Sequence, residues 1–454
     1  MCIAMSDVSL AEQMNPWWRD PSALPPGLRH TRRSMQREIV RRLKEEPRRA
    51  TMLRGPRQVG KTTLLHQCVA DLIQADWPPS NVTYFDFSDE RVVAKSSSPR
   101  KLAEYQPAGA NAALPRVLLL DEVTRSERWA EWLEQAVDAG GHRICVTDSA
   151  ASLLRGGTTE SGVGRWDDLE LETLTYPEFL LLQAREDEDA AGVERRVPRA
   201  FERYLRLGGF PEHILDESEL RAWGRLRDDI SGRAIRKDLA AAQVDTERVN
   251  HVFQYLVESS GEILDPRKLA SQLGASVPAP DRRSLEKWLH LLESTLLIRR
   301  LTRRTGAASS RSKAQANARS YAADHGLVMA FAPIVDPGTD DETRGRACEA
   351  LVYRHLRELE REQLVRLSFH RAARGEDEID FVVDRREGSP VPIEVKHSQR
   401  PGSGALAALP ARADAIGAER CLMIHGGPEV AERDGVQMVP LRDFALDVPR
   451  YILA

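Results

Sequence analysis

Short apolar runs alternate with helical patterns across residues 1–200. The runs that predict strands are Thr51–Leu53, Val82–Phe87, Arg116–Leu120 and Arg143–Thr147. Each of them precedes a segment of helical character, and this alternation is typical of a parallel sheet covered by helices. We therefore predict an α/β domain over residues 1–200, which includes an N-terminal extension.

Residues 201–320 carry an almost wholly helical pattern. Asp245, Asp265 and Asp281 each stand where a helix would begin, because an aspartate side chain accepts hydrogen bonds from the first free backbone N–H groups. The segment Leu297–Leu301 follows the third of these helices and predicts a strand. Three short helices followed by a basic hairpin indicate a winged helix-turn-helix.

Residues 321–454 return to an alternation of strands and helices. The predicted helices are Ala347–Glu358 and Leu406–Ile416, and the predicted strands are Glu378–Asp384, Val391–Lys396, Cys421–Ile424 and Val436–Pro440. Together they predict a compact third module of the α/β class.

The composition narrows the class of protein. Of the 454 residues, 41% are hydrophobic and 30% are charged, which argues against global disorder, and no apolar run is long enough to span a membrane. The formal net charge of -4 excludes a wholly basic DNA-coating protein. The cysteines have no CxxC spacing and the N-terminus lacks a signal-peptide pattern, so we expect a protein of the reducing cytoplasm.

Residues 55–62, with the sequence GPRQVGKT, fit the pattern GxxxxGK[ST] between a predicted strand and a predicted helix. Glycines let consecutive backbone N–H groups curl around a phosphate, and the helix N-terminus adds partial positive charge. Lys61 would reach the β- and γ-phosphates, and the Thr62 hydroxyl would bind Mg²⁺. We therefore predict an ATP and Mg²⁺ site formed by Gly55, Pro56, Arg57, Gln58, Val59, Gly60, Lys61, Thr62 and Thr63.

A second acidic motif follows the strand that ends at Leu120. Four apolar residues indicate a strand buried on both faces, after which Asp121 emerges at its carboxyl end. Asp121 would help to hold Mg²⁺, and Glu122 would orient the water that attacks the γ-phosphate. The alternative for Glu122 is an ordinary surface acid.

The next predicted strand ends in polar residues. Thr147 and Ser149 lie where a group that senses the γ-phosphate is expected, although Ser and Thr are also common at strand ends for their turn chemistry. Arg165 is a candidate arginine finger or phosphate sensor, and the alternative is a solvated surface arginine.

The motifs GPRQVGKTTL, LLLDEV, TDSA, TYPEFL and LGGFPEHI resemble those of the prokaryotic AAA-type ATPases that are often labelled "ATP-binding protein". The resemblance covers nearly the whole chain after Arg33. It implies an AAA-type P-loop ATPase domain, then a winged helix, and then a domain of unknown function that resembles PD-(D/E)XK nucleases.

The chain departs from this family in two places. It has Asp148 and Ala150 where the family usually has Gly and Ser, and Lys237-Asp238 where the family has an Arg-Asp pair. The first departure bears on the phosphate sensor, and the second on a role for Arg236 at a subunit boundary.

A second candidate site lies in the third module. Period-2 geometry places Glu394 and Lys396 on one face of a strand, and Asp380 lies on the strand before it. Two carboxylates and an ammonium group suit Mg²⁺ and phosphodiester cleavage. Glu349 resembles the additional helical acid of PD-(D/E)XK enzymes. The alternatives are a nuclease-like fold that only binds DNA or a partner, and an exposed hairpin with salt bridges.

The stretch Arg299–Arg319 carries no acidic residue, and its basic residues are Arg299, Arg300, Arg303, Arg304, Arg311, Lys313 and Arg319. Such an excess indicates contact with DNA phosphates, with Arg282, Arg283 and Lys287 on the third helix placed to enter a groove. The alternatives are a solvated basic linker and a winged helix that serves as a protein–protein spacer.

These observations predict an ATPase that couples nucleotide state to DNA binding and, through the last module, to Mg²⁺-dependent cleavage. We expect DNA as a partner, a homo-oligomer as a possible assembly, and no membrane. The main alternative is an ATP-controlled binding or signalling switch with an inert nuclease-like module. A regulator linked to defence or to a toxin is a third alternative.

Overall fold

The computed structural model describes residues 7–25, 28, 31–45, 48–93, 98–149, 164–184, 190–239, 244–273, 280–304, 318–333, 336–371 and 378–454. The chain divides into two compact units, Met1–Glu172 and Thr173–Ala454. The domain boundaries predicted at 200/201 and 320/321 do not coincide with this division. Strand β7 (Arg319–Ala322) runs across the second of them.

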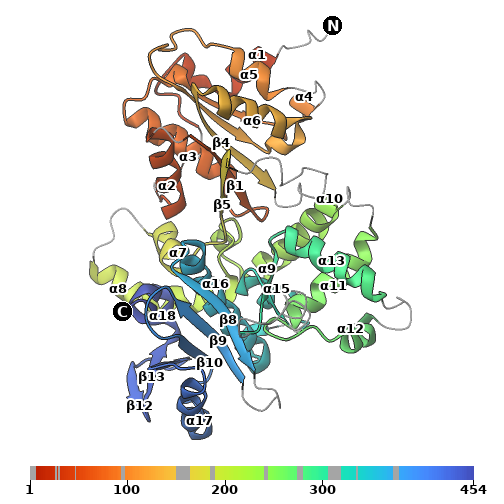
Figure 1. Ribbon diagram of the computed structural model, residues 1–454, viewed down its shortest axis with the longest axis vertical. Coiled ribbons are helices and arrows are strands. Elements are labelled where there is room, and N and C mark those ends of the chain that lie inside the picture. The colour runs from red at the N-terminus through yellow and green to blue at the C-terminus, as the bar shows by residue number, and fades with distance from the viewer. Residues whose placement is uncertain are drawn as a thin grey trace. The chain divides into compact units, whose positions relative to one another are not determined.

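The first unit is built on a parallel sheet in the order β2-β3-β4-β1-β5 (Figure 1). Its strands are β1 (Ala50–Gly55), β2 (Val82–Asp86), β3 (Arg116–Asp121), β4 (His142–Ser149) and β5 (Trp166–Glu170). Because all five strands are parallel, their carboxyl ends lie along one edge of the sheet. The carboxyl ends of β1, β3 and β4, which are neighbours in the sheet, therefore lie together at that edge, where we expected the nucleotide.

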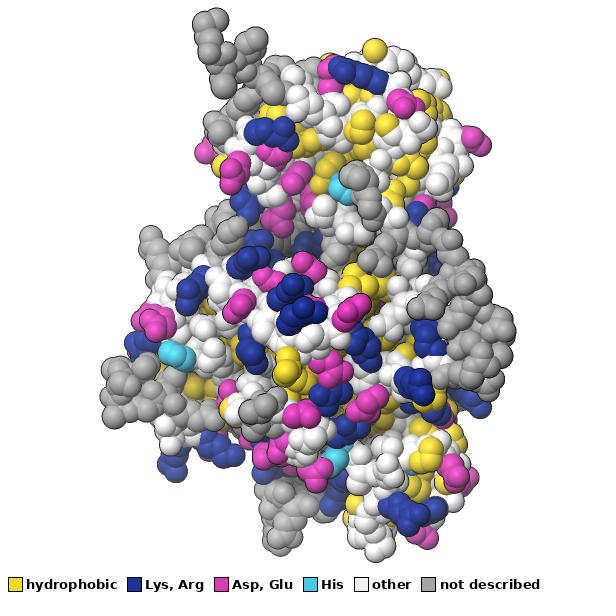
Figure 2. Space-filling model, turned by 180° about the vertical axis from the view of Figure 1, so that it is seen from behind, with side chains coloured by type: hydrophobic (Ala, Val, Ile, Leu, Met, Phe, Trp, Pro, Cys, Tyr) yellow, Lys and Arg dark blue, Asp and Glu magenta, His cyan; other side chains and the backbone are white. Residues whose placement is uncertain are grey.

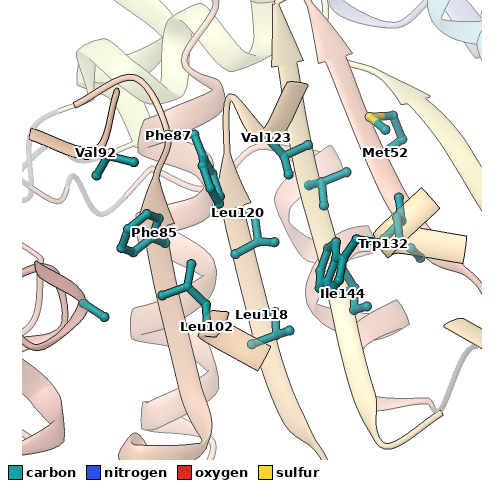
Figure 3. Packing of buried hydrophobic residues seen from close by; sticks show 14 of the residues in the cluster. Met52, Phe85, Phe87, Val92, Leu102, Leu118, Leu120, Val123, Trp132 and Ile144 are labelled. Carbon is teal, nitrogen blue, oxygen red and sulfur yellow. The ribbon is translucent and has the colours of Figure 1, made fainter. Parts of the chain in front are cut away.

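Helices cover both faces of this sheet. They are α1 (Asp7–Met14), α2 (Ser34–Lys44), α3 (Lys61–Gln74), α4 (Glu90–Val93), α5 (Pro99–Glu104) and α6 (Trp129–Ala139). One face packs in a single apolar cluster against α1, α5 and α6 (Figure 3). This cluster contains side chains from alternate strand positions, such as Leu118 and Leu120 of β3, together with Leu102 of α5 and Trp132 of α6.

The second unit begins with helices. They are α7 (Tyr176–Gln183), α8 (Ala190–Leu207), α9 (Glu219–Arg227), a π-helical segment (Asp228–Ile235), α10 (Arg236–Leu239), α11 (Thr246–Glu258), α12 (Pro266–Leu273) and α13 (Arg282–Ser294). The predicted caps at Asp245 and Asp281 are confirmed, because their carboxylates accept backbone N–H bonds from the first turns of α11 and α13. Strand β6 (Ile298–Leu301) then pairs with β7 in antiparallel fashion.

A mixed sheet follows in the order β12-β13-β11-β10-β9-β8. Its strands are β8 (Val365–Arg371), β9 (Glu378–Arg385), β10 (Val391–Lys396), β11 (Cys421–His425), β12 (Ala431–Arg433) and β13 (Val436–Pro440). The accompanying helices are α15 (His325–Phe331), α16 (Asp341–Arg361), α17 (Ser403–Asp414), α18 (Leu441–Leu446) and α19 (Val448–Ile452). Strands β9 and β10 are antiparallel neighbours, and this pairing brings Asp380 close to Glu394.

Within the described ranges, no helix combines the length and the apolar character needed to cross a bilayer. The described cysteines Cys68, Cys145, Cys348 and Cys421 are buried free thiols.

Candidate functional site

The loop between β1 and α3 has the backbone that a phosphate cradle requires. Gln58 and Gly60 have φ values of 65° and 94°, in the left-handed region, and α3 begins directly after Gly60. Val59 is fully buried and anchors the loop, and its carbonyl accepts a hydrogen bond from Arg33 Nη1 at 3.3 Å. The N-terminus of a helix of 14 residues therefore opens onto this loop.

Gly55 is required by a close approach of the backbone. A Cβ atom at this position would lie 2.4 Å from the carbonyl oxygen of Leu171, which follows β5. The backbone at Leu171 is fixed, because its N–H donates to the Arg54 carbonyl over 2.7 Å. The first glycine of the motif thus lets the loop start against the neighbouring strand.

Lys61 is folded along the loop. Its Nζ donates to the carbonyl oxygens of Gly55 at 2.8 Å and of Pro56 at 3.0 Å, and the residue is 7% exposed. Burial lowers the pKa of Lys61, while the charges of Glu122 and Asp121 act in the opposite direction. The ammonium group is therefore placed within the loop that would surround phosphates.

Asp121 joins the loop to the end of β3. Its Oδ2 accepts a hydrogen bond from Thr62 Oγ1 at 2.6 Å and another from the Tyr84 hydroxyl at 3.2 Å. Its Oδ1 accepts a bond from Thr147 Oγ1, and Asp121 is 2% exposed. The structure thus brings together the hydroxyl and the carboxylate that the sequence assigns to Mg²⁺.

Thr147 holds Asp121 and Glu122 in one network. Strand β4 lies between β3 and β1, so that Thr147 stands at the carboxyl edge between the two motifs. Its hydroxyl donates to Asp121 and accepts the backbone N–H of Glu122 at 3.0 Å. Glu122 has a positive φ of 52°, and its Oε2 lies 3.6 Å from Arg125 Nε. Its side chain is 14% exposed.

The second predicted site also converges, but around an arginine. The Arg319 guanidinium lies 3.1 Å from Glu349 Oε1, 3.3 Å from Asp380 Oδ1 and 2.6 Å from Glu378 Oε1. Lys396 Nζ lies 2.7 Å from Glu394 Oε1. Burial, and after it the charge of Asp380, raises the pKa of both Glu349 and Glu394.

Family models match three consecutive parts of the chain. Residues 47–180 match the model described as an AAA domain. Residues 198–337 and 344–444 match two domains of unknown function, DUF8612 and DUF4143. The chain carries an AAA-type P-loop domain.

Individual proteins match parts of the chain at low identity, and the chain spans about 60% of the length of the curated relative that it matches. A Haemophilus influenzae protein described as uncharacterized is 23% identical over 252 residues, which make up 54% of this chain and 60% of that protein. The Walker-type ATPase PABY2304 of Pyrococcus abyssi has a TM-score of 0.41 at 15% identity, over 68% of this chain and 98% of its own. The Aeropyrum pernix ORC2 protein, solved in ADPNP-ADP complexes, has a TM-score of 0.36 at 15% identity, over 68% and 93%.

Within the AAA domain, the prediction for Arg165 needs correction. Arg165 precedes β5, and its carbonyl accepts the backbone N–H of Ala50 at the start of β1. It therefore lies at the amino edge of the sheet, opposite the phosphate loop, and its guanidinium pairs with Asp138 at 3.1 Å. A role as phosphate sensor in its own chain is wrong, and a finger role in a neighbouring copy stays a prediction. The side chain of Ser149 lies outside the described residues.

Sequence reasoning missed several polar groups of the AAA domain. Tyr84 binds Asp121, and its ring lies 4.4 Å from the ring of His66 on α3. Asp86 ends β2 beside the site, where burial raises its pKa and the charge of Asp121 acts in the same direction. For Asp86 the available signal is its place at the carboxyl end of β2, which does not state which strands are neighbours. Tyr84 lies in the middle of the same strand and His66 lies on α3, so no comparable signal marks them.

The metal role predicted for Glu349, Asp380 and Glu394 also needs correction. Across the described part of the chain, no group of three or more His, Cys, Asp or Glu side chains is arranged to hold a metal ion. The acids do meet, but Arg319 contacts two of them, and Lys396 binds the third. The residues therefore do not fit a divalent ion in this arrangement.

The predicted basic surface is largely neutralised where it is described. Arg300 pairs with Glu293, Arg304 pairs with Asp384 at 2.9 Å, and Arg319 is buried among acids. On the face of the molecule drawn in Figure 2, basic and acidic side chains are interspersed. Arg311 and Lys313 lie outside the described residues. On α13, by contrast, Arg282, Arg283 and Lys287 are exposed.

Proposed function

We propose that the AAA domain binds and hydrolyses ATP at the carboxyl edge of its sheet. The observation that carries this proposal is the hydrogen-bonded connection from the phosphate loop to the acidic motif. The hydroxyls of Thr62 and Thr147 both donate hydrogen bonds to the Asp121 carboxylate, and the Lys61 ammonium group lies within the loop. Such a constellation suits a triphosphate, whose charge needs backbone N–H groups, an ammonium group and a cation.

Mg²⁺ fits this site by the chemistry of its donors. A threonine hydroxyl and a buried carboxylate are hard oxygen ligands beside the helix N-terminus, and Thr62 and Asp121 would hold the ion together with phosphate oxygens. When bound, Mg²⁺ neutralises developing negative charge on the phosphates.

The remaining steps belong to side chains of this chain. The Lys61 ammonium group exchanges its two carbonyl acceptors for phosphate oxygens of ATP. Glu122 orients a water molecule toward the γ-phosphorus, whose bond to the β–γ bridging oxygen breaks to release ADP and phosphate. Positioning and charge stabilisation supply most of the catalysis in such reactions.

Two substitutions separate binding from hydrolysis. We expect Lys61→Ala to abolish ATP binding, with Lys44→Ala on the exposed end of α2 as the matched control. We expect Glu122→Gln to bind ATP and to lose turnover by two orders of magnitude or more, with the exposed Glu131→Gln as its control. Calorimetric titration and phosphate release measure the two effects. Normal turnover by Lys61→Ala would refute the assignment.

The alternative of a slow ATP-controlled switch makes a different prediction. In a switch, the wild type would retain ATP with turnover as slow as that of Glu122→Gln. A wild-type rate well above that of the variant supports the enzyme, and equal rates support the switch.

A second candidate function is DNA binding through α13. The order α11, α12, α13 and the β6–β7 pair supports a winged-helix arrangement, and the exposed face of α13 carries Arg283 and Lys287. Arg282, on the same face, pairs with Glu286 at 2.9 Å. This helix supports contact with phosphates better than the neutralised residues of Arg299–Arg304.

The salt dependence of DNA affinity tests this candidate. Reversal of Arg283 and Lys287 to Glu should weaken binding and lower the slope of log affinity against log salt by about one per lost phosphate contact. Reversal of the exposed Arg37 and Lys44 on α2 is the matched control. An unchanged slope in the α13 variant would exclude this helix as a phosphate contact.

A further inference from the structure

Arg319 is the most enclosed cation of the second unit's carboxylate cluster. The cluster consists of Glu349, Glu378, Asp380 and Glu394, from α16, β9 and β10. Arg319 is 6% exposed, and its guanidinium contacts three of these acids. The guanidinium carbon also lies 5.1 Å from the centre of the Phe369 ring. The cation is therefore held on several sides by β7, β8, β9 and α16.

The position of this cation is the one that a metal would need. Arg319 Nη1 bridges Glu349 and Asp380, two of the three acids that the sequence assigns to an ion. A divalent ion at ordinary ligand distances of about 2.0–2.6 Å from the same oxygens would overlap the guanidinium. The arginine and the metal thus exclude one another.

The other oxygens of the cluster are largely engaged as well. Asp380 Oδ2 accepts the backbone N–H of Val395 at 2.9 Å, and Glu394 Oε1 binds Lys396. Glu394 is 8% exposed, and within the described part of the chain its Oε2 has no hydrogen-bond partner. This buried oxygen is a ready acceptor for a second cation, should the arginine be removed.

We propose that Arg319 is a built-in counter-ion that replaces a divalent metal in this cluster, so that the cluster fastens β7 to α16 and β9 and performs no metal-dependent cleavage. A neutral side chain at this position converts the same carboxylates into a divalent-cation site. The residue at position 319, the first of β7, therefore decides whether the module is a metal site.

Manganese binding to the nucleotide-free full chain tests the proposal, with Mn²⁺ measured by electron paramagnetic resonance. We expect Arg319→Gln to gain one Mn²⁺ per chain relative to the wild type, and we expect the double variant with Asp380→Asn to lose that ion. Arg319→Lys, which retains a cation, should gain none. An Arg319→Gln protein that folds but gains no ion would overturn the proposal.

The wild type keeps the proposal testable even if Arg319→Gln fails to fold. We expect Mn²⁺ binding by the wild type to be the same as that of Asp380→Asn, since any ion at the phosphate loop does not depend on Asp380. Wild-type Mn²⁺ binding that Asp380→Asn removes would overturn the proposal. Mn²⁺-dependent DNA cleavage by the wild type that Lys396→Ala abolishes would do the same.

Discussion

Thr147→Val isolates the contribution of one hydroxyl to the nucleotide site. Thr147 is fully buried at the end of β4, and valine has nearly the same shape. Its hydroxyl makes two hydrogen bonds, one donated to the Asp121 carboxylate and one accepted from the Glu122 N–H. The substitution therefore removes a polar link without opening a cavity.

The size of the effect follows from these two bonds. A hydrogen bond to a charged group contributes about 1.5–3 kcal/mol, and a bond between neutral groups contributes about 0.5–1.5 kcal/mol. If the bond to Asp121 alone is lost in the transition state, the rate falls by about 10- to 100-fold, because 1.4 kcal/mol corresponds to about a factor of ten. The Glu122 N–H also loses its acceptor in this variant. This adds to the loss in rate, because that hydrogen bond helps to hold Glu122 at its positive φ.

Phosphate release at saturating ATP measures kcat, and its dependence on Mg²⁺ concentration reports on Asp121. We expect Thr147→Val to lower kcat and to raise the Mg²⁺ midpoint, while ATP affinity changes little, since the cradle is made by the loop after β1. Thr147→Ser keeps the hydroxyl and should retain most of the activity. A Thr147→Val enzyme within twofold of the wild type, or a serine variant as slow as the valine variant, would refute the reasoning.

Two further changes have calculable consequences. Gly55→Ala should lower the free energy of unfolding by about 1–3 kcal/mol and weaken ATP binding, because the new Cβ would lie 2.4 Å from the Leu171 carbonyl oxygen. Urea unfolding measures the first effect, and calorimetric titration of the folded variant with ATP measures the second. Burial lowers the pKa of His355 to about 3. As the pH falls, this histidine is therefore protonated in the unfolded chain before it is protonated in the folded chain. The free energy of unfolding should fall by about 1.4 kcal/mol per pH unit below pH 6.5. His355→Gln should flatten this decline by about 2 kcal/mol between pH 6.5 and 5 in denaturant melts, and an unchanged slope would assign the decline to other groups.

Local signals account for what the sequence predicted well. Asp245 and Asp281 act on N–H groups two or three residues away, so their role as helix caps can be read from the sequence. The strand Arg116–Asp121 is apolar on both faces because helices cover both faces of a parallel sheet. In these cases the information lies within one short segment.

Strand β5 shows where local signals end. Its sequence, WDDLE, has three acids and no β-branched residue, so no strand pattern is present. It forms because β1 offers a parallel edge and because arginines of the first unit neutralise its acids. Arg42 and Arg49 pair with Asp167, and Arg54 lies 3.2 Å from Asp168. The position of Arg165 follows from this strand, and so the sequence could not place it.

The carboxylate cluster shows the same difference between what local sequence predicts and what tertiary contacts decide, here for a candidate functional site. Spacing on two strands predicts that Asp380 and Glu394 converge, and they do. Spacing carries no information on which cation meets them, because Arg319 comes from a strand that pairs with β6 and lies far from both acids in the sequence. The local charge of Arg299–Arg319 suggested a surface for DNA phosphates, whereas the fold uses its last arginine to neutralise carboxylates of its own chain. A motif of acids therefore predicts a demand for positive charge, and tertiary structure decides whether a metal or a side chain supplies it.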